Sequence, residues 1–89
     1  MSVRIDVYEA QACQQCRDTK RWLERRRIVH RSHVLTDAVR SMAREAGYSQ
    51  APVVVVTTDL GLVLDCWGGF NPERLLKWAV QGETEEAES

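Results

Sequence analysis

The sequence predicts an α/β fold, in which a four-stranded mixed sheet is flanked by three helices. Its segments follow the order strand, helix, strand, helix, strand, strand, helix. A continuous β-branched run at 53–57 is typical of a central strand that is covered on both faces. The first crossover should be right-handed, which makes the first two strands parallel. The 89 residues make one small domain, which we expect over residues 1–81, followed by an acidic, disordered segment at 82–89.

The first half of the chain contains a strand–helix–strand unit and a second helix. Val3–Tyr8 alternates as a half-buried strand does, and Gln14–Arg27 lacks Gly and Pro and is expected to be helical. Ile28–Leu35 is the next predicted strand. Thr36 then caps a helix over Asp37–Ala46. The apolar residues at helical spacing, expected to form its buried stripe, are Ala38, Val39, Met42, Ala43 and Ala46.

The second half is predicted to form a hairpin and a last helix. Val53–Thr57 and Leu62–Trp67 are strands, joined by a tight turn at Thr58–Gly61. Asn71 is a strong helix cap before Pro72, and the helix should run to about Gln81. The residues of this helix expected to be buried are Leu75, Leu76 and Ala79.

Cys13-Gln14-Gln15-Cys16 has the layout of a dithiol redox site. The motif lies between the first strand and the first helix. A Cys at the first turn of a helix faces unpaired backbone N–H groups and the positive end of the helix dipole, which favour the nucleophilic thiolate. Cys16 returns to the same helix face and can close a disulfide with Cys13. We expect Cys13 to be the nucleophile and Cys16 the resolving thiol.

Composition favours a cytoplasmic protein that does not interact with membranes. The chain is 44% hydrophobic and 28% charged, and no apolar run approaches the ~20 residues of a membrane span. The N-terminus lacks the apolar segment of a secretory signal. Three cysteines cannot form a disulfide framework, because one is always left over. A reducing compartment and a catalytic pair fit better.

The net charge of −1 hides an asymmetry between the two halves. Residues 1–45 hold ten Lys/Arg and six Asp/Glu, whereas residues 46–89 hold two and seven. The basic residues of the first helix form either a solvated face or a surface that steers an acidic partner toward the thiol. We expect no nucleic-acid binding, since no basic–aromatic interleaving accompanies these charges.

A zinc-binding module is an alternative from another class. Cys13 and Cys16 are followed by His30 and His33, with thirteen residues between the pairs. The usual zinc-finger spacing is about twelve, with both histidines on a helix. Here they fall on a predicted strand, where three positions apart means opposite faces.

Two further motifs make the chain resemble the NrdH-redoxin family, glutaredoxin-like proteins of the thioredoxin fold. Gly47–Val54 resembles the family's GYxQAPVV segment, and Trp67–Glu73 resembles its WSGFRPD segment. With the CxxC motif they occur in the right order and at the right spacings, and the resemblance covers Val3–Val80. It implies the thioredoxin/glutaredoxin fold, βαβαββα.

The resemblance also implies an activity and its partners. It implies a thiol–disulfide oxidoreductase, an electron donor to class Ib ribonucleotide reductase that is recycled by NADPH-dependent thioredoxin reductase. The chain would be a monomer whose redox group is the Cys13–Cys16 disulfide, with no bound cofactor and no metal. The Ala51–Pro52 peptide bond would be cis and lie against the CxxC motif. The residues implied in substrate or partner binding are Gln15, Gln50, Ala51, Pro52, Trp67, Gly68, Gly69 and Phe70, with Tyr8 a weaker candidate.

Trp67 and Phe70 have two interpretations. They are either simple packing residues or a flat apolar surface that braces the loop facing the CxxC motif. Cys66 shares the strand parity of Leu62 and Leu64, so we expect it on the core face as a small buried hydrophobe.

Several positions depart from related families. The resemblance implies that a glutathione-dependent glutaredoxin, the main alternative, would carry a Lys before the CxxC motif and two Asp after the paired glycines; Ala10, Asn71 and Pro72 occupy these positions. Within the NrdH pattern, Gly68 replaces a Ser, and Glu9 would oppose thiolate formation if it lies close to the thiol. A thioredoxin-fold partner subunit without catalysis is a further alternative.

Overall fold

The computed structural model describes residues 3–82. Residues 83–89, which hold most of the predicted acidic segment, lie outside the described part. The elements follow the predicted order, which is β1 (Val3–Glu9), α1 (Gln14–Arg25), β2 (Arg31–Val34), α2 (Asp37–Glu45), β3 (Val53–Thr58), β4 (Val63–Gly68) and α3 (Pro72–Ala79).

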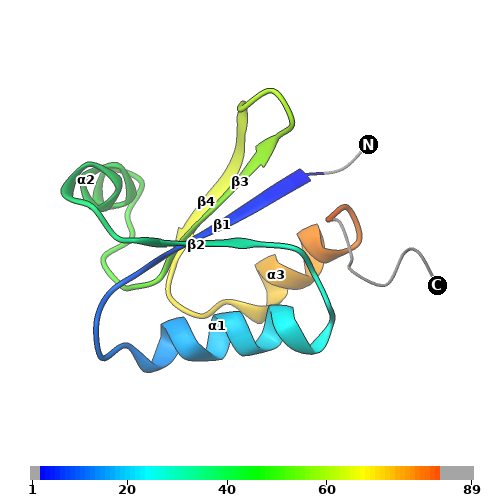
Figure 1. Ribbon diagram of the computed structural model, residues 1–89. Helices are drawn as coiled ribbons and strands as arrows, with labels where there is room; N and C mark the ends of the chain where they lie inside the picture. Colours follow the sequence, from blue (N-terminus) through cyan, green and yellow to red (C-terminus); the bar gives the residue numbers. More distant parts are fainter. Residues whose placement is uncertain (1–2, 83–89) are drawn as a thin grey trace.

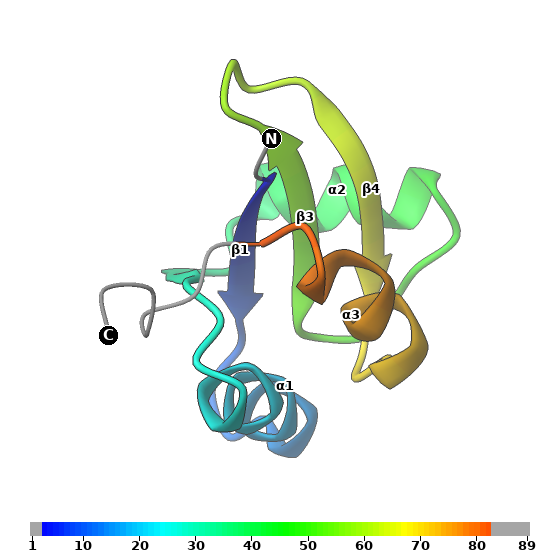
Figure 2. The same ribbon diagram turned by 90° about the vertical axis from the view of Figure 1, so that its right-hand side faces the viewer.

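The four strands form one mixed sheet in the order β2-β1-β3-β4. β1 pairs in parallel with β2 and antiparallel with β3, and β3 pairs antiparallel with β4. Helices α1 and α3 lie on one face of the sheet and α2 lies on the other (Figures 1 and 2). This arrangement confirms the predicted α/β fold with three flanking helices.

Two hydrophobic clusters, one on each face, hold the helices to the sheet. The larger cluster joins Leu23 of α1 and Leu75 of α3 to Val7, Val54 and other strand residues. The smaller cluster joins Ala43 of α2 to alternate residues of β3. Residues 53–56 are all buried, which confirms the prediction of a central strand covered on both faces.

Both predicted helix caps are confirmed. Thr36 Oγ1 accepts a hydrogen bond from the Val39 N–H at 3.3 Å, and Asn71 Oδ1 accepts one from the Arg74 N–H at 3.1 Å. These bonds satisfy backbone donors that a helix start leaves without partners.

The end of α1 differs from the prediction. Arg27 has a φ of +57°, so the helix stops at Arg25, and the Ile28 N–H donates to the carbonyl of Leu23 at 3.0 Å. Ile28 then turns into the core, and β2 begins only at Arg31 rather than at residue 28. The left-handed turn therefore falls at Arg27, the last residue of the predicted helix.

The predicted buried stripes of α2 and α3 were partly wrong. On α2 only Ala43 is buried, with Val39 half-buried; Ala38, Met42 and Ala46 are exposed. On α3 Leu76 is 59% exposed.

Trp78, which the prediction omitted, is buried on α3 in place of Leu76. Its indole N–H donates to Asp65 Oδ2 of β4 at 2.9 Å, which lets the large ring pack inward without an unpaired donor. Helix α3 also ends at Ala79, two residues before the predicted end.

The predicted core face of β4 was also wrong in part. Leu62 lies outside the strand and Leu64 is 41% exposed. Both lie beyond the small area of the sheet that α2 covers, because α2 packs against Val53 and Val55 at the other end of β3. Among residues 3–82, no helix is long and apolar enough to cross a membrane.

Candidate active site

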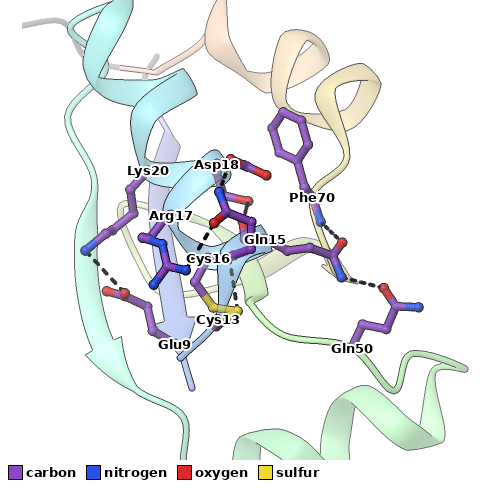
Figure 3. Close-up of a disulfide and its surroundings, with 11 residues drawn as sticks. Glu9, Cys13, Gln15, Cys16, Arg17, Asp18, Lys20, Gln50 and Phe70 are labelled. Carbon is purple, nitrogen blue, oxygen red and sulfur yellow. Dashed lines mark hydrogen bonds and ion pairs between the residues drawn. A yellow bond between two sulfur atoms is a disulfide. The ribbon is translucent and has the colours of Figure 1, made fainter. Parts of the chain in front are cut away.

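Cys13 and Cys16 are joined by a disulfide at the start of α1, with their Cα atoms 5.2 Å apart (Figure 3). Cys13 is the N-cap residue of the helix, and its Sγ accepts a hydrogen bond from the Cys16 N–H at 3.1 Å. Cys13 is partly exposed, whereas Cys16 is only 1% exposed. A backbone N–H directed at Sγ stabilises negative charge on that sulfur, as the sequence led us to expect.

The charge of Glu9 near this motif is balanced by the helix itself. Its Oε1 lies 3.2 Å from the Nζ of Lys20 (Figure 3). Lys20 lies on α1, four residues after Cys16. The nearby positive charge offsets the opposition to a thiolate that Glu9 alone would create.

Gln15, between the two cysteines, ties three separate segments together. Its Nε2 donates to Gln50 Oε1 at 2.8 Å, and its Oε1 accepts the Phe70 N–H at 2.9 Å (Figure 3). The Gly69 N–H donates to the carbonyl of Pro52 at 2.8 Å. The helix start, the loop before β3 and the loop after β4 therefore form one connected surface beside the disulfide.

The Ala51–Pro52 peptide bond is cis, as the resemblance implied. Pro52 is buried and Ala51 is half-buried. Because the Pro52 side chain is buried, only the residues next to it in the chain can contact a partner at this point.

Two glycines allow the loops to cross closely. An added Cβ on Gly69, whose φ is +85°, would lie 3.0 Å from Gln15 Oε1. A Cβ on Gly68 would lie 2.6 Å from the backbone oxygen of Gln50 and 3.0 Å from Tyr48 Cβ. In the backbone arrangement of this chain, a Ser in place of Gly68 would place its Cβ against both of these atoms.

The expectation of an apolar landing surface is wrong for Trp67. Its side chain is 0% exposed and belongs to the larger core cluster. It braces the loop from beneath and cannot contact a partner. Phe70 is half-buried, so of these two aromatic side chains it is the one that has exposed surface.

The sequence analysis missed a polar cluster that supports the loop before Pro52. Arg74 of α3 donates to the Tyr48 hydroxyl at 3.2 Å and to Asp65 Oδ1 at 2.7 Å. Tyr48 lies two residues before Gln50. The only signal in the sequence was Asp65 itself, a charged residue within a strand that is otherwise apolar.

The side chains of two further candidates, Tyr8 and Cys66, pack against the smaller core cluster, on the face of the sheet that α2 covers. Tyr8 stacks on His33 with ring centroids 4.7 Å apart, and burial, followed by the Asp6 carboxylate, raises the pKa of its hydroxyl.

Cys66 is half-buried beside the smaller core cluster rather than fully buried. Burial raises the pKa of its thiol; the Asp65 carboxylate raises it further, and Arg74 opposes both effects. A thiol with this environment is a weak nucleophile at neutral pH.

The residues of the zinc alternative are not brought together. His33 Nε2 lies 2.7 Å from Asp6 Oδ1, and His30 Nδ1 lies 2.9 Å from the carbonyl of Ile28. Within residues 3–82, no three His, Cys, Asp or Glu side chains are grouped so that they could hold a metal ion.

Comparison with solved structures identifies the family. The chain is similar to the NrdH-redoxin of Escherichia coli, described as a glutaredoxin-like protein with a thioredoxin-like activity profile. The two share 32% sequence identity over 83% of this chain and 92% of the other, with a TM-score of 0.61. This chain belongs to the NrdH-redoxin family. Comparisons with protein-family models and with curated proteins found no match.

Family membership and the disulfide together establish the type of reaction. The sheet with three helices is the thioredoxin/glutaredoxin fold, as predicted. This NrdH-redoxin-like protein is a thiol–disulfide oxidoreductase whose redox group is the Cys13–Cys16 pair. The alternative of a subunit without catalysis was therefore wrong.

Proposed function

We propose that this redoxin carries electrons to class Ib ribonucleotide reductase and is recycled by NADPH-dependent thioredoxin reductase. It acts in the cytoplasm as a monomer, with residues 1–81 as its single domain, and binds no cofactor or nucleic acid. The observation that carries this proposal is the position of Cys13 at the N-cap of α1, where its side chain is partly exposed and its sulfur accepts a hydrogen bond from a backbone N–H.

In the proposed reaction, the Cys13 thiolate attacks one sulfur of the partner's disulfide. A bond forms between Cys13 Sγ and that sulfur, and the partner's other sulfur leaves as a thiolate, which takes a proton from water. Cys16 then loses its proton and attacks Cys13 Sγ, which forms the Cys13–Cys16 disulfide and releases the partner's second thiolate. Two electrons have passed to the partner. Buried Cys16 suits the second step, because it attacks within the chain and needs no access for the partner.

The choice of thioredoxin reductase as donor rests on what the site lacks for glutathione. Ala10, Asn71 and Pro72 stand where glutathione-binding relatives would carry a Lys and two acids. In addition, the Phe70 N–H is already bonded to Gln15. Each charge-assisted hydrogen bond contributes roughly 1.5–3 kcal/mol, so losing two weakens glutathione binding by about two to four orders of magnitude.

The test compares two donor systems on the oxidised protein. NADPH oxidation is followed with thioredoxin reductase and, separately, with millimolar glutathione plus glutathione reductase. We expect fast turnover with the first and slow turnover with the second. A faster reaction with glutathione would contradict the proposal and favour a glutathione-dependent glutaredoxin.

The roles of the two cysteines are tested with serine variants. We expect Cys13→Ser to abolish disulfide reduction and Cys16→Ser to accumulate a mixed disulfide with the partner, visible by mass spectrometry. Iodoacetamide should label Cys13 first in the reduced protein near neutral pH. Preferential labelling of Cys16 would reverse the assignment.

A further inference from the structure

A shallow groove of about 160 Å³ runs between α1 and the loop that carries Phe70. We call it the basic groove. The residues that line it are Asp18, Arg21, Trp22, Arg25, Arg26 and Phe70.

Two aromatic rings form the apolar part of the basic groove. Trp22 and Phe70 are half-buried and pack against the larger core cluster, which holds them in place. The Arg26 guanidinium lies 3.8 Å from the centre of the Trp22 ring. In Figure 3 the Phe70 ring points away from Gln50. The groove therefore offers fixed aromatic surface with a cation already seated on one ring.

The charge of the basic groove is not balanced within the described chain. It has three arginines and one acid, and Asp18 Oδ1 already accepts a hydrogen bond from Gln14 Nε2 at 2.9 Å. Among residues 3–82, Arg21, Arg25 and Arg26 form no ion pair, in contrast to Lys20. A ligand that complements this surface carries negative charge.

The basic groove begins beside the disulfide. The Phe70 N–H is bonded to Gln15, which lies between the two cysteines. At 1.5 Å per helical residue, Arg21 and Arg25 lie ~9 and ~15 Å along α1 from Gln15. An extended chain covers these distances in about three and five residues.

We propose that the basic groove binds an acidic segment of the protein whose disulfide this redoxin reduces. The segment follows the reactive cysteines and places acidic side chains about three and five residues from them, with an apolar side chain against Trp22 and Phe70. This inference rests on the proposed function and adds the class of substrate. Attraction between such a segment and the arginines raises the rate of productive encounter as well as affinity.

The kinetic test uses two synthetic peptides that each contain one internal disulfide. They differ only three and five residues after the second cysteine, where one carries Glu and the other Lys. The rate constant for peptide reduction is measured with the wild-type protein, with an Arg21→Gln/Arg25→Gln variant, and with an Arg31→Gln/Arg44→Gln variant. The control removes the same charge from exposed sites on β2 and α2.

For the acidic peptide we expect the groove variant to be about five- to tenfold slower and the control to change less than twofold, since exposed ion pairs act over short range. The Lys peptide should not be slowed by the groove variant. Equal slowing by both variants would overturn the inference, because it would indicate only a long-range effect of net charge.

A binding test separates this inference from the proposed function. The acidic peptide with serines in place of both cysteines cannot react, so NMR of the tryptophan indole signals reports binding alone. We expect the Trp22 signal to shift while those of buried Trp67 and Trp78 do not. Three results would each contradict a partner's acidic segment as the occupant. The first is a Trp22 signal that the peptide does not change, and the second is a single-stranded oligonucleotide that binds more tightly than the peptide. The third is a Trp22 signal that shifts with salt concentration when no peptide is present. Failure of every protein to reduce either peptide would count against the proposed function instead.

Discussion

Replacement of Gly68 by Ala adds one methyl group at the crossing of two loops. The new Cβ would lie 2.6 Å from the backbone oxygen of Gln50 and 3.0 Å from Tyr48 Cβ. Neither atom belongs to the free end of a flexible side chain, and Tyr48 is held by Arg74 through its hydroxyl. The loop before Pro52 must therefore shift away from β4.

The size of the effect follows from two opposing contributions. Overpacking of this kind costs about 1–3 kcal/mol, whereas loss of a glycine's freedom in the unfolded chain returns about 0.4–1 kcal/mol. The net loss of stability is about 1–2 kcal/mol, which for a domain of this size lowers the Tm by roughly 5–15 °C. Gly68→Ser, which restores the residue of the family segment, should destabilise at least as much.

Thermal unfolding followed by circular dichroism, together with the rate of insulin disulfide reduction, measures both consequences. Gly82→Ala is the control, because its added Cβ would first meet a side-chain methyl group, Ile28 Cγ2, at 3.3 Å. We expect Gly68→Ala to melt lower and to react more slowly, since the shifted loop carries Gln50 and Ala51. A Gly68→Ala protein as stable as the wild type, or a Gly82→Ala protein equally destabilised, would refute the reasoning.

Four more predictions concern Gln15 and Cys66. Gln15→Ala leaves the Phe70 N–H without its acceptor, so it should cost about 1 kcal/mol in urea unfolding and slow insulin reduction, whereas Gln14→Ala should do neither. Cys66→Ala should cost about 1 kcal/mol with insulin reduction largely retained; a loss of activity in the folded variant would place Cys66 in the mechanism. Burial raises the pKa of Cys66. When the rate of its labelling by iodoacetamide is measured against pH in the oxidised protein, the midpoint should therefore lie at a higher pH than that of a free cysteine. Stability should fall as pH rises past the ordinary thiol range, because the unfolded state ionises first; a flat profile there would contradict this.

The features that could be predicted from the sequence are those with a local cause. Thr36 and Asn71 mark helix starts because their side chains satisfy nearby backbone donors. The CxxC motif was placed correctly because a helix follows it directly, and the β-branched run gave β3. These signals lie within a few residues of the feature that they predict.

The errors came from features that depend on tertiary packing. Leu76 and Trp78 both lie on α3, and their spacing alone cannot say which of them faces the sheet. Trp78 does so because Asp65 of β4 is there to accept its N–H. Likewise, Gln15 is bonded to Gln50 and to Phe70, which follow it by 35 and 55 positions in the chain. No local pattern could indicate such a link.

The uneven cover of the sheet has a consequence for native-state hydrogen exchange. Helix α2 contributes one fully buried side chain, Ala43, to the face that it covers, whereas α1 alone buries Cys16, Thr19 and Leu23. Elements with little buried surface open first in partial unfolding. The amide hydrogens of α2 should therefore exchange well before those of α1. Cys66 is half-buried beside the cluster to which α2 contributes, so a bulky thiol reagent should reach Cys66 more readily in this opened state, while the redox pair stays packed.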